Sequence, residues 1–511
     1  DFDVKSLGAG DGVVVYEQAG YLHVLDPATG DSHRIEVEAA GDLTWAEPRW
    51  EEVSANQLGN AGLSPTGKRA VFEYRGEIFT VPAEKGSWRN LTRSSGVADR
   101  YPSWSPDGSK LAWFDDEGGE YGLVIADQDG GNRRRITIPD ASYYYDPVWS
   151  PDGTRLAFTN TDFRVLVMDV PTGRITDVDG EAYAVPQRSL SQAWSPDSRY
   201  VSYTKRLDNL LRAVFVYDAE TGETHQVTDG MADAITPVWD QSGKYLYLLA
   251  STDVALNTSW LDMTSYDRPV TRSLYLVLLE DGEASPFLPR SDEEGGATAD
   301  EEEGGGGQAE QGGQGSRGGR NRPAEAPEVA IDFEGIGSRI VDAPGLPPRN
   351  YQGLVAGPEG HVFVLEPGGG GGGRGGGGGG RGGSALQRYS VEDREAEEFV
   401  TGVGAVAVSQ DRKHLLYRSG SNWSIVGTDR APGSNAGRLA LDGLRVRIEP
   451  IEEWAQMLRE GWRYMRDYLY VDNTHGAPWD DVWNWYSAWL PDVGHRSDFN
   501  ALLDMVSGEI S

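Results

Sequence analysis

The stretch Trp104-Ser105-Pro106-Asp107-Gly108 decides the fold of this chain, because it returns at a constant interval. It recurs as Trp149 to Gly153, as Trp194 to Ser198 and, in weaker form, as Trp239 to Gly243. Each tryptophan therefore follows the previous one by 45 residues. A four-stranded blade of a β-propeller needs about 40 to 50 residues. The repeat predicts a ring of blades.

Each copy of this phrase is predicted to form a turn between two strands. Pro106 sets φ at the second position of a type I turn, Asp107 suits the third position and Gly108 relieves the fourth. The runs that follow are rich in β-branched and aromatic residues, as in a half-buried sheet. They are Leu111–Trp113, Leu156–Phe158, Val201–Tyr203 and Leu246–Leu248, then Leu123–Ile125, Val165–Val167, Val214–Val216 and Tyr275–Val277. Three copies end in a short outer strand, at Ile136-Thr137, Ile175-Thr176 and Val227-Thr228. Four strands per repeat are predicted.

Weaker copies of the repeat extend the ring in both directions. Leu63 to Gly67 supplies one earlier turn, and the segments Gly353 to Leu365 and Val406 to Val426 supply two later units. Turns are then expected near residues 63, 104, 149, 194, 239, 357 and 410. We predict an all-β fold, a seven-bladed β-propeller over residues 46–447.

The two ends of the chain do not fit the repeat. Apolar runs at 13–16, 21–25 and 34–37 predict a partial blade, so residues 1–45 are interpreted as the tail of an upstream propeller. Beyond Pro450 the apolar period becomes helical. Helices are expected over 452–470 and 480–490, with a third that begins at Ser497 as its N-cap. Residues 450–511 are interpreted as a truncated helical domain.

Composition limits the partners and excludes several kinds of chemistry. Two inserts, Ser291 to Glu328 and Gly368 to Gly383, carry too few apolar residues to pack and are expected to be disordered loops. The net charge of −34 disfavours a nucleic-acid partner. No apolar stretch reaches about 18 residues, so no membrane partner is expected. The chain has no Cys, which excludes disulfides and thiolate chemistry.

No catalytic, cofactor-binding or metal-binding residue is predicted. The sequence lacks the Gly-x-Ser-x-Gly and His-Glu-x-x-His motifs, and the glycine run lacks the strand and helix that a phosphate-binding loop requires. We interpret Asp115-Asp116 and Asp480-Asp481 as charges stabilised by solvent and by a helix dipole, and His475 as a turn residue. Most of the 16 tryptophans are expected to pack the blades. The seven histidines are isolated along the chain: His23, His33, His225, His361, His414, His475 and His495.

Two long stretches of this sequence resemble the tricorn protease family. The run Asn90 to Gly108 and the following Gly118 to Tyr121 are similar to the start of the second propeller of that family. The stretch from Glu453-Trp454-Ala455-Gln456-Met457 to Arg466-Asp467-Tyr468 resembles the helical segment that precedes its catalytic part. The resemblance implies a large cytoplasmic serine peptidase that trims oligopeptides and assembles as a homohexamer, although a periplasmic location stays open.

The resemblance also implies where the catalytic residues belong. In such proteases a Ser-His pair follows the stretch that matches Asp504 to Ile510, and the nucleophilic serine lies further downstream. This sequence contains neither, and Ser511 is assigned no role. We therefore predict a non-catalytic, substrate-gating propeller that is inactive alone. The alternative is a stand-alone TolB-like or WD-type propeller that binds a protein partner.

Overall fold

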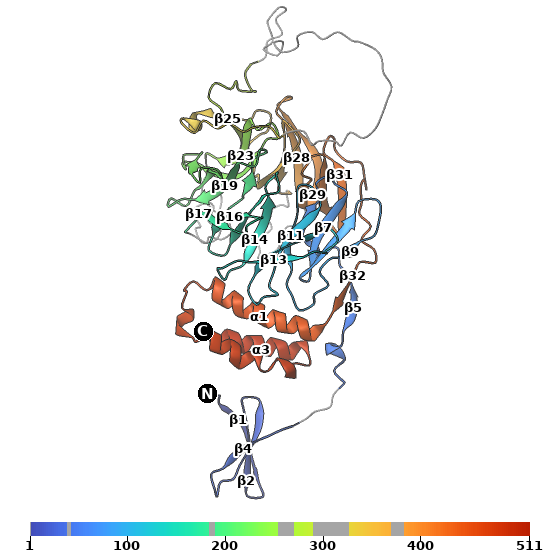
Figure 1. Ribbon diagram of the computed structural model, residues 1–511, viewed down its shortest axis with the longest axis vertical. Coiled ribbons are helices and arrows are strands. Elements are labelled where there is room, and N and C mark those ends of the chain that lie inside the picture. The colour runs from blue at the N-terminus through green and yellow to red at the C-terminus, as the bar shows by residue number, and fades with distance from the viewer. Residues whose placement is uncertain are drawn as a thin grey trace, which may run out of the picture.

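Short antiparallel strands surround a central axis in the computed structural model, which describes residues 2–37, 42–182, 190–253, 270–289, 326–368 and 383–510 (Figure 1). Five blades are separate four-stranded sheets whose strands follow chain order. Their strands are β6 (Gly59–Leu63), β7 (Arg69–Tyr74), β8 (Glu77–Pro82) and β9 (Arg89–Asn90); β10 (Arg100–Trp104), β11 (Lys110–Asp115), β12 (Gly122–Asp127) and β13 (Arg134–Thr137); β14 (Tyr144–Trp149), β15 (Arg155–Asn160), β16 (Arg164–Asp169) and β17 (Ile175–Gly180); β18 (Ala193–Trp194), β19 (Tyr200–Arg206), β20 (Arg212–Asp218) and β21 (Thr224–Gln226); β22 (Asp233–Trp239), β23 (Tyr245–Ser251), β24 (Ser273–Leu278) and β25 (Ile340–Asp342).

The sixth and seventh blades share one long strand. They form a six-stranded sheet of β26 (Gly353–Ala356), β27 (His361–Glu366), β28 (Ser384–Ser390), β29 (Glu395–Val408), β30 (His414–Ser419) and β31 (Asn422–Gly427). The first part of β29 pairs with β28 as the outer strand of the sixth blade. Its last residues pair with β30 as the inner strand of the seventh. The described strands thus form seven blades, which confirms the predicted propeller.

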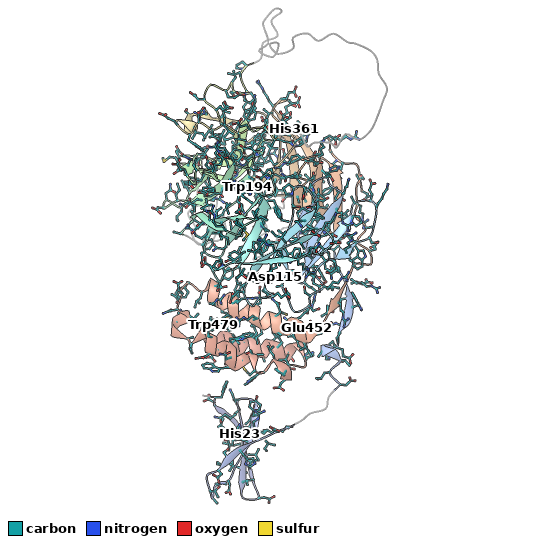
Figure 2. All side chains as sticks on the ribbon, in the orientation of Figure 1. His23, Asp115, Trp194, His361, Glu452 and Trp479 are labelled. Atoms are coloured by element: carbon teal, nitrogen blue, oxygen red, sulfur yellow. The ribbon has the colours of Figure 1, made fainter. Side chains whose placement is uncertain are left out.

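The repeated tryptophans join neighbouring blades. Each ends an inner strand and is buried (Figure 2 labels Trp194). The indole of Trp149 donates to the carbonyl of Ser103 at 3.3 Å, and that of Trp194 donates to Val148 at 3.0 Å. The indole of Trp239 donates to Ala193 at 3.1 Å. Each acceptor is the residue directly before the repeated tryptophan of the preceding blade. The 45-residue period therefore also sets the spacing between blades.

The ring closes by packing and by a short ribbon. The indole of Trp423 in β31 donates to the carbonyl of Ala55 at 3.1 Å and packs against Phe72, with ring centroids 4.8 Å apart. The amide of Asp411 donates to the carbonyl of Pro65 at 3.0 Å. Outside the blades, β5 (Arg49–Glu52) pairs with β32 (Arg445–Ile448), so the two ends of the propeller sequence lie side by side.

The N-terminal segment forms a sheet of its own, below the propeller and the helices in Figure 1. Its strands are β1 (Val4–Gly10), β2 (Val13–Gln18), β3 (Tyr21–Leu25) and β4 (Ser32–Ile35). The last three correspond to the predicted runs, and β1 is an addition. All seven residues of β1 are exposed, so it carries no alternation of buried and exposed positions from which a strand can be predicted.

Three α-helices follow the propeller in the described chain: α1 (Pro450–Tyr468), α2 (Trp479–Ser487) and α3 (Arg496–Gly508). They enclose their own apolar core, in which the indoles of Trp462 and Trp479 donate to each other's backbone carbonyls. The predicted N-cap of the third helix is wrong. His495 caps α3, because its Nδ1 accepts from the Ser497 amide at 3.1 Å while Asp498 accepts from the His495 amide.

The predicted disordered inserts, near 291–328 and 368–383, fall almost entirely outside the described residues, which omit 290–325 and 369–382. Where the chain is described again, Val329 is buried and its amide donates to Asp197 at 3.1 Å. None of the helices in the described chain is both long and apolar enough to cross a lipid bilayer.

Candidate functional site

The inner strands enclose a cavity of about 320 Å³ on the axis side of the ring. It is lined by residues 60–63 of β6, 101–104 of β10, 146–149 of β14 and 407–408 of β29. These segments belong to the first, second, third and seventh blades. The cavity is therefore part of the central channel that a propeller encloses.

A backbone bulge recurs in the wall of this channel. Asn60, Tyr101, Asp146 and Thr236 have φ of +42°, +56°, +50° and +48°, and each lies three residues before the end of its inner strand. The pairing register with the next strand shifts at each of these positions. Left-handed backbone is strained for residues other than Gly, by roughly 1–3 kcal/mol, and such strain gathers at functional sites. Bulges also re-aim side chains.

Sequence reasoning missed these bulges, although a signal was present. Proline follows the bulged residue in three blades, as Tyr101-Pro102, Asp146-Pro147 and Thr236-Pro237. In each blade this proline lies two residues before the repeated tryptophan. Proline inside a sheet marks an edge or a bulge, because it cannot donate to the strand ladder. The spacing of proline to tryptophan therefore indicates a deformed inner strand.

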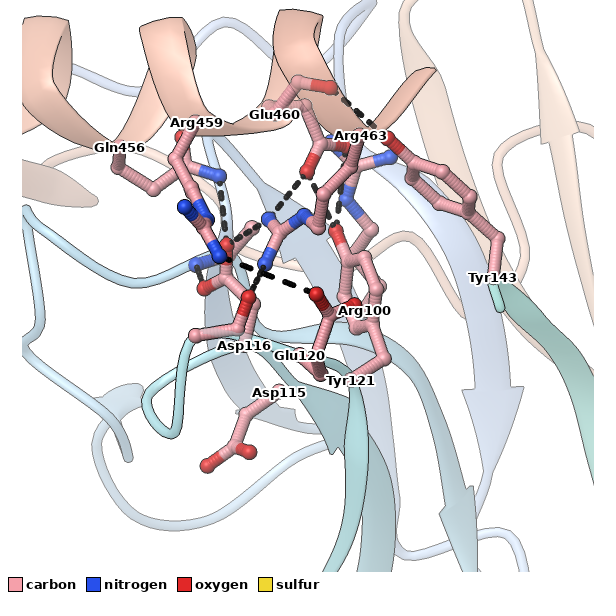
Figure 3. A network of polar contacts seen from close by, with 12 residues as sticks. Arg100, Asp115, Asp116, Glu120, Tyr121, Tyr143, Gln456, Arg459, Glu460 and Arg463 are labelled. Atoms are coloured by element: carbon pink, nitrogen blue, oxygen red, sulfur yellow. Dashed lines mark hydrogen bonds and ion pairs between the residues drawn. The ribbon is translucent and has the colours of Figure 1, made fainter. Parts of the chain in front are cut away.

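Helix α1 is attached to the second blade by a buried charge network (Figure 3). The guanidinium of Arg463 is fully buried and donates to the carboxylate of Asp116, to the carbonyl of Gly119 at 2.6 Å and to Glu460 at 2.8 Å. Burial lowers the pKa of this guanidinium, but Asp116 and Glu460 raise it by more, so Arg463 stays charged. Arg466 donates to both oxygens of Glu120, each at 2.8 Å.

The structure corrects the interpretation of Asp115 and Asp116 as solvated charges. Their exposed fractions are 4% and 7%. Asp115, which Figure 3 shows apart from the Arg463 network, pairs with Arg135 at 2.6 Å. Asp116 faces Arg463, a residue 347 positions later in the chain. The error arose because α1 covers this strand end only in the tertiary structure.

Tyrosines continue the contact from α1 toward the channel. Arg100, at the start of β10, pairs with Glu460 at 2.9 Å, and the Tyr143 hydroxyl donates to the Glu460 carbonyl at 2.9 Å. The ring of Tyr143 lies 5.4 Å from that of Tyr468. Burial, with a further contribution from nearby Tyr101, raises the pKa of Tyr468 to about 12. The end of α1 therefore lies near Tyr101, a residue of the channel wall, and Tyr468 is neutral at physiological pH.

The other residues that the sequence singled out are spread over the molecule. His475 lies in an exposed turn with φ of +55°, and its Nε2 is 2.9 Å from the Tyr470 hydroxyl. Asp480 and Asp481 lie in the first turn of α2, as predicted. In the described residues no group of three or more His, Cys, Asp or Glu is placed to hold a metal ion. Most of the described tryptophans are buried, but Trp45, Trp50 and Trp485 are 66%, 64% and 47% exposed.

Comparison with known proteins agrees with this architecture. The family profile "Tricorn protease second beta propeller domain" matches residues 58–429, and "Tricorn protease C1 domain" matches residues 450–508. Tricorn protease homolog 1 of Streptomyces coelicolor is 26% identical over 97% of this chain and 46% of its own length. A tricorn protease homolog of Saccharolobus solfataricus is 22% identical over 100% of this chain and 43% of its own length.

A crystal structure of tricorn protease superimposes on the whole chain with a TM-score of 0.73, at 17% identity and over 46% of that protein. The chain spans about half the length of the relatives that it matches. The propeller profile alone covers well over half of its residues. The chain therefore belongs to the tricorn protease family.

Proposed function

We propose that this propeller guides extended oligopeptides through its channel toward a serine-type peptidase site that lies outside the 511 residues. The observation that carries the proposal is the cavity between the inner strands, whose wall is formed by Asn60, Tyr101 and Asp146 at left-handed bulges. A channel of this kind admits an unfolded chain and excludes a folded domain.

The channel wall supports binding of an extended chain. A β-bulge re-aims the side chains of its strand. At these bulges side chains already pair with the backbone, because the Tyr101 amide donates to Glu73 at 3.1 Å and the Asp146 carbonyl accepts from Gln192 at 2.7 Å. Tyr101 adds an aromatic ring, which lies 5.5 Å from the ring of Tyr145 in an edge-to-face arrangement. Aromatic rings supply contact area at low entropic cost. The side chains of the wall therefore suit an extended ligand with varied side chains.

The remaining parts of the proposal follow from the family. Nucleophilic catalysis requires a hydroxyl, a base within hydrogen-bond reach and an oxyanion site. We assign none of these to the described residues and propose that the chain is inactive alone. We further propose that it works in the cytoplasm as part of a homohexamer, and that β1–β4 belong to an adjoining propeller.

The test uses the absence of cysteine from the chain. A Ser103→Cys substitution places a single thiol in the channel wall, where a bulky maleimide can be attached. We expect a labelled ten-residue peptide to bind the unmodified protein and to bind the blocked protein at least tenfold more weakly, as measured by fluorescence anisotropy. The matched control is Ser434→Cys with the same maleimide, because Ser434 is exposed and lies outside the cavity lining.

Two results would contradict the proposal. Equal peptide affinity in the blocked and unblocked proteins would mean that peptides do not use the channel. Release of a fluorophore from peptide substrates by the purified 511-residue chain would mean that the chain is not inactive.

A further inference from the structure

A second cavity, of about 530 Å³, lies outside the channel, where the first blade, the β5–β32 ribbon and the start of α1 meet. Figure 1 shows β5, β32 and β9 together at this edge of the molecule. We call it the arginine pocket, defined by Trp50, Trp88, Arg89, Arg93, Arg445 and Arg447. Its volume is in the range of ordinary ligand sites.

The ribbon presents two of these arginines on its outer face. Residues directly opposite each other in an antiparallel pair lie on the same side, and Arg447 is opposite Trp50. The alternate residues Val446 and Ile448 are buried in the core. Arg445 and Arg447 therefore point away from the core together with the exposed ring of Trp50.

The pocket brings four arginines together with the carboxylates of Glu77, Glu449 and Glu452. Arg447 is paired with Glu449 at 3.1 Å and Arg445 with Glu52 at 3.7 Å, which leaves Arg89 and Arg93 to meet a ligand. Arg89 and Arg93 have no carboxylate within 4.0 Å among the described residues, and the Nε of Arg93 donates only to the carbonyl of Asn90. Burial, followed by the charge of Arg89, lowers the pKa of neighbouring Arg69. The positive charges of Arg69 and Arg89 are close enough to repel each other. In a chain of net charge −34, such a cluster is suited to an anionic ligand.

The walls of the arginine pocket are held in place before any ligand arrives. The hydroxyl of Ser95 donates to the carbonyl of Arg447 at 2.9 Å, which joins the loop after β9 to the ribbon. The amide of Arg93 donates to the side chain of Asn90 at 3.1 Å, and Asn90 in turn donates to the buried carboxylate of Glu77. A preorganised site loses less entropy on binding.

We propose that the arginine pocket binds an acidic peptide segment. Guanidinium groups bind carboxylates through paired hydrogen bonds, and Arg89 and Arg93 are free to do so. Trp50 and Trp88 offer faces for an apolar side chain between the carboxylates. A long polyanion would meet the negative charge of the rest of the chain, and Glu449 and Glu452 in the lining repel a multiply charged anion, which favours a segment with few carboxylates.

Fluorescence anisotropy with a labelled octapeptide of two glutamates, two leucines and four serines tests this proposal. We expect binding that weakens as salt is raised, and no binding of the peptide in which glutamine replaces glutamate. The double variant Arg89→Gln/Arg93→Gln should bind at least tenfold more weakly, and Trp50→Ala several-fold more weakly. The control is Arg430→Gln, which removes an exposed arginine outside the pocket and should bind as the unchanged protein does.

Several results would overturn the proposal. One is equal affinity of the double variant and the unchanged protein, with both folded by circular dichroism. Another is no peptide binding even at low salt. A third is displacement of the peptide by inorganic tripolyphosphate at lower concentrations than by the unlabelled peptide, which would identify a phosphate site. Blocking the channel at Ser103→Cys should leave this binding unchanged, so the result is independent of the proposed channel function.

Discussion

Arg463 is the residue on which the attachment of α1 to the propeller most depends. Replacing it with Met leaves Asp116 without its buried counter-charge, whereas Glu460 keeps its pair with Arg100. Breaking a buried ion pair by removing one partner costs about 3–5 kcal/mol. We expect Arg463→Met to lower the free energy of unfolding by this amount, as measured by urea denaturation with tryptophan fluorescence.

The control for Arg463 is an ion pair on the surface. Arg164 and Asp177 are 2.7 Å apart, but their side chains are 38% and 54% exposed. Exposed pairs contribute about 0–1 kcal/mol, so Arg164→Met should change the unfolding free energy little. Equal losses in the two variants would contradict a special role for the buried network. The double variant Arg463→Met/Asp116→Leu should recover part of the loss, since it removes the orphaned charge.

Asp99 makes the stability of the propeller depend on pH. It is buried and accepts from the indole of Trp113 at 2.6 Å and from Ser94 at 2.7 Å. Burial raises its pKa from 3.8 to about 7. The folded state therefore holds this proton more tightly than the unfolded state, and stability falls as pH rises from about 4 to about 7.

The Asp99→Asn variant keeps the hydrogen-bond acceptor and removes the titration. We expect its unfolding free energy to fall less than that of the unchanged protein between pH 4 and pH 7, by about 3 to 4 kcal/mol. Urea titrations at several pH values measure the difference. Parallel pH profiles for the two proteins would rule out Asp99 as the cause.

At the scale of the element, the inner strand and its terminal tryptophan form the joint between blades. Trp194→Phe removes the hydrogen bond from the indole to the Val148 carbonyl, and a hydrogen bond of this kind contributes about 0.5–1.5 kcal/mol. Trp104→Phe is the matched control, because the buried Nε1 of Trp104 has no hydrogen-bond partner in the described residues. Both variants lose the same ring volume. Trp194→Phe should therefore be the more destabilising in urea, and equal losses would show that the indole bond contributes nothing.

At the scale of the whole molecule, the ring closes without a strand shared by its first and last blades in the described chain. The closure instead uses the β5–β32 ribbon and the contact of Phe72 with Trp423. The arginine pocket lies beside this closure. The N-terminal sheet meets the helical segment at Trp489, whose ring centroid is 6.1 Å from that of Phe2 and 6.4 Å from that of Tyr21.

The fold was predictable because its information is periodic and local. The stretch Trp104 to Gly108 predicts a turn and its two flanking strands from a few neighbouring residues. Three later copies repeat it at the same spacing. The helical period after Pro450 is local in the same way. The strand β1 was missed because none of its residues is buried, so no such period exists there.

The sites could not be predicted in this way, because they join residues that are far apart in the chain. Asp116 meets Arg463, and Arg89 shares a pocket with Arg447, only after the ring has closed. From the sequence alone, the carboxylate of Asp116 is expected to be solvated, because the position of α1 over it is not known. Local periodicity thus determined the number and order of the blades, whereas ring closure and helix docking decided which charges are buried and where a ligand can bind.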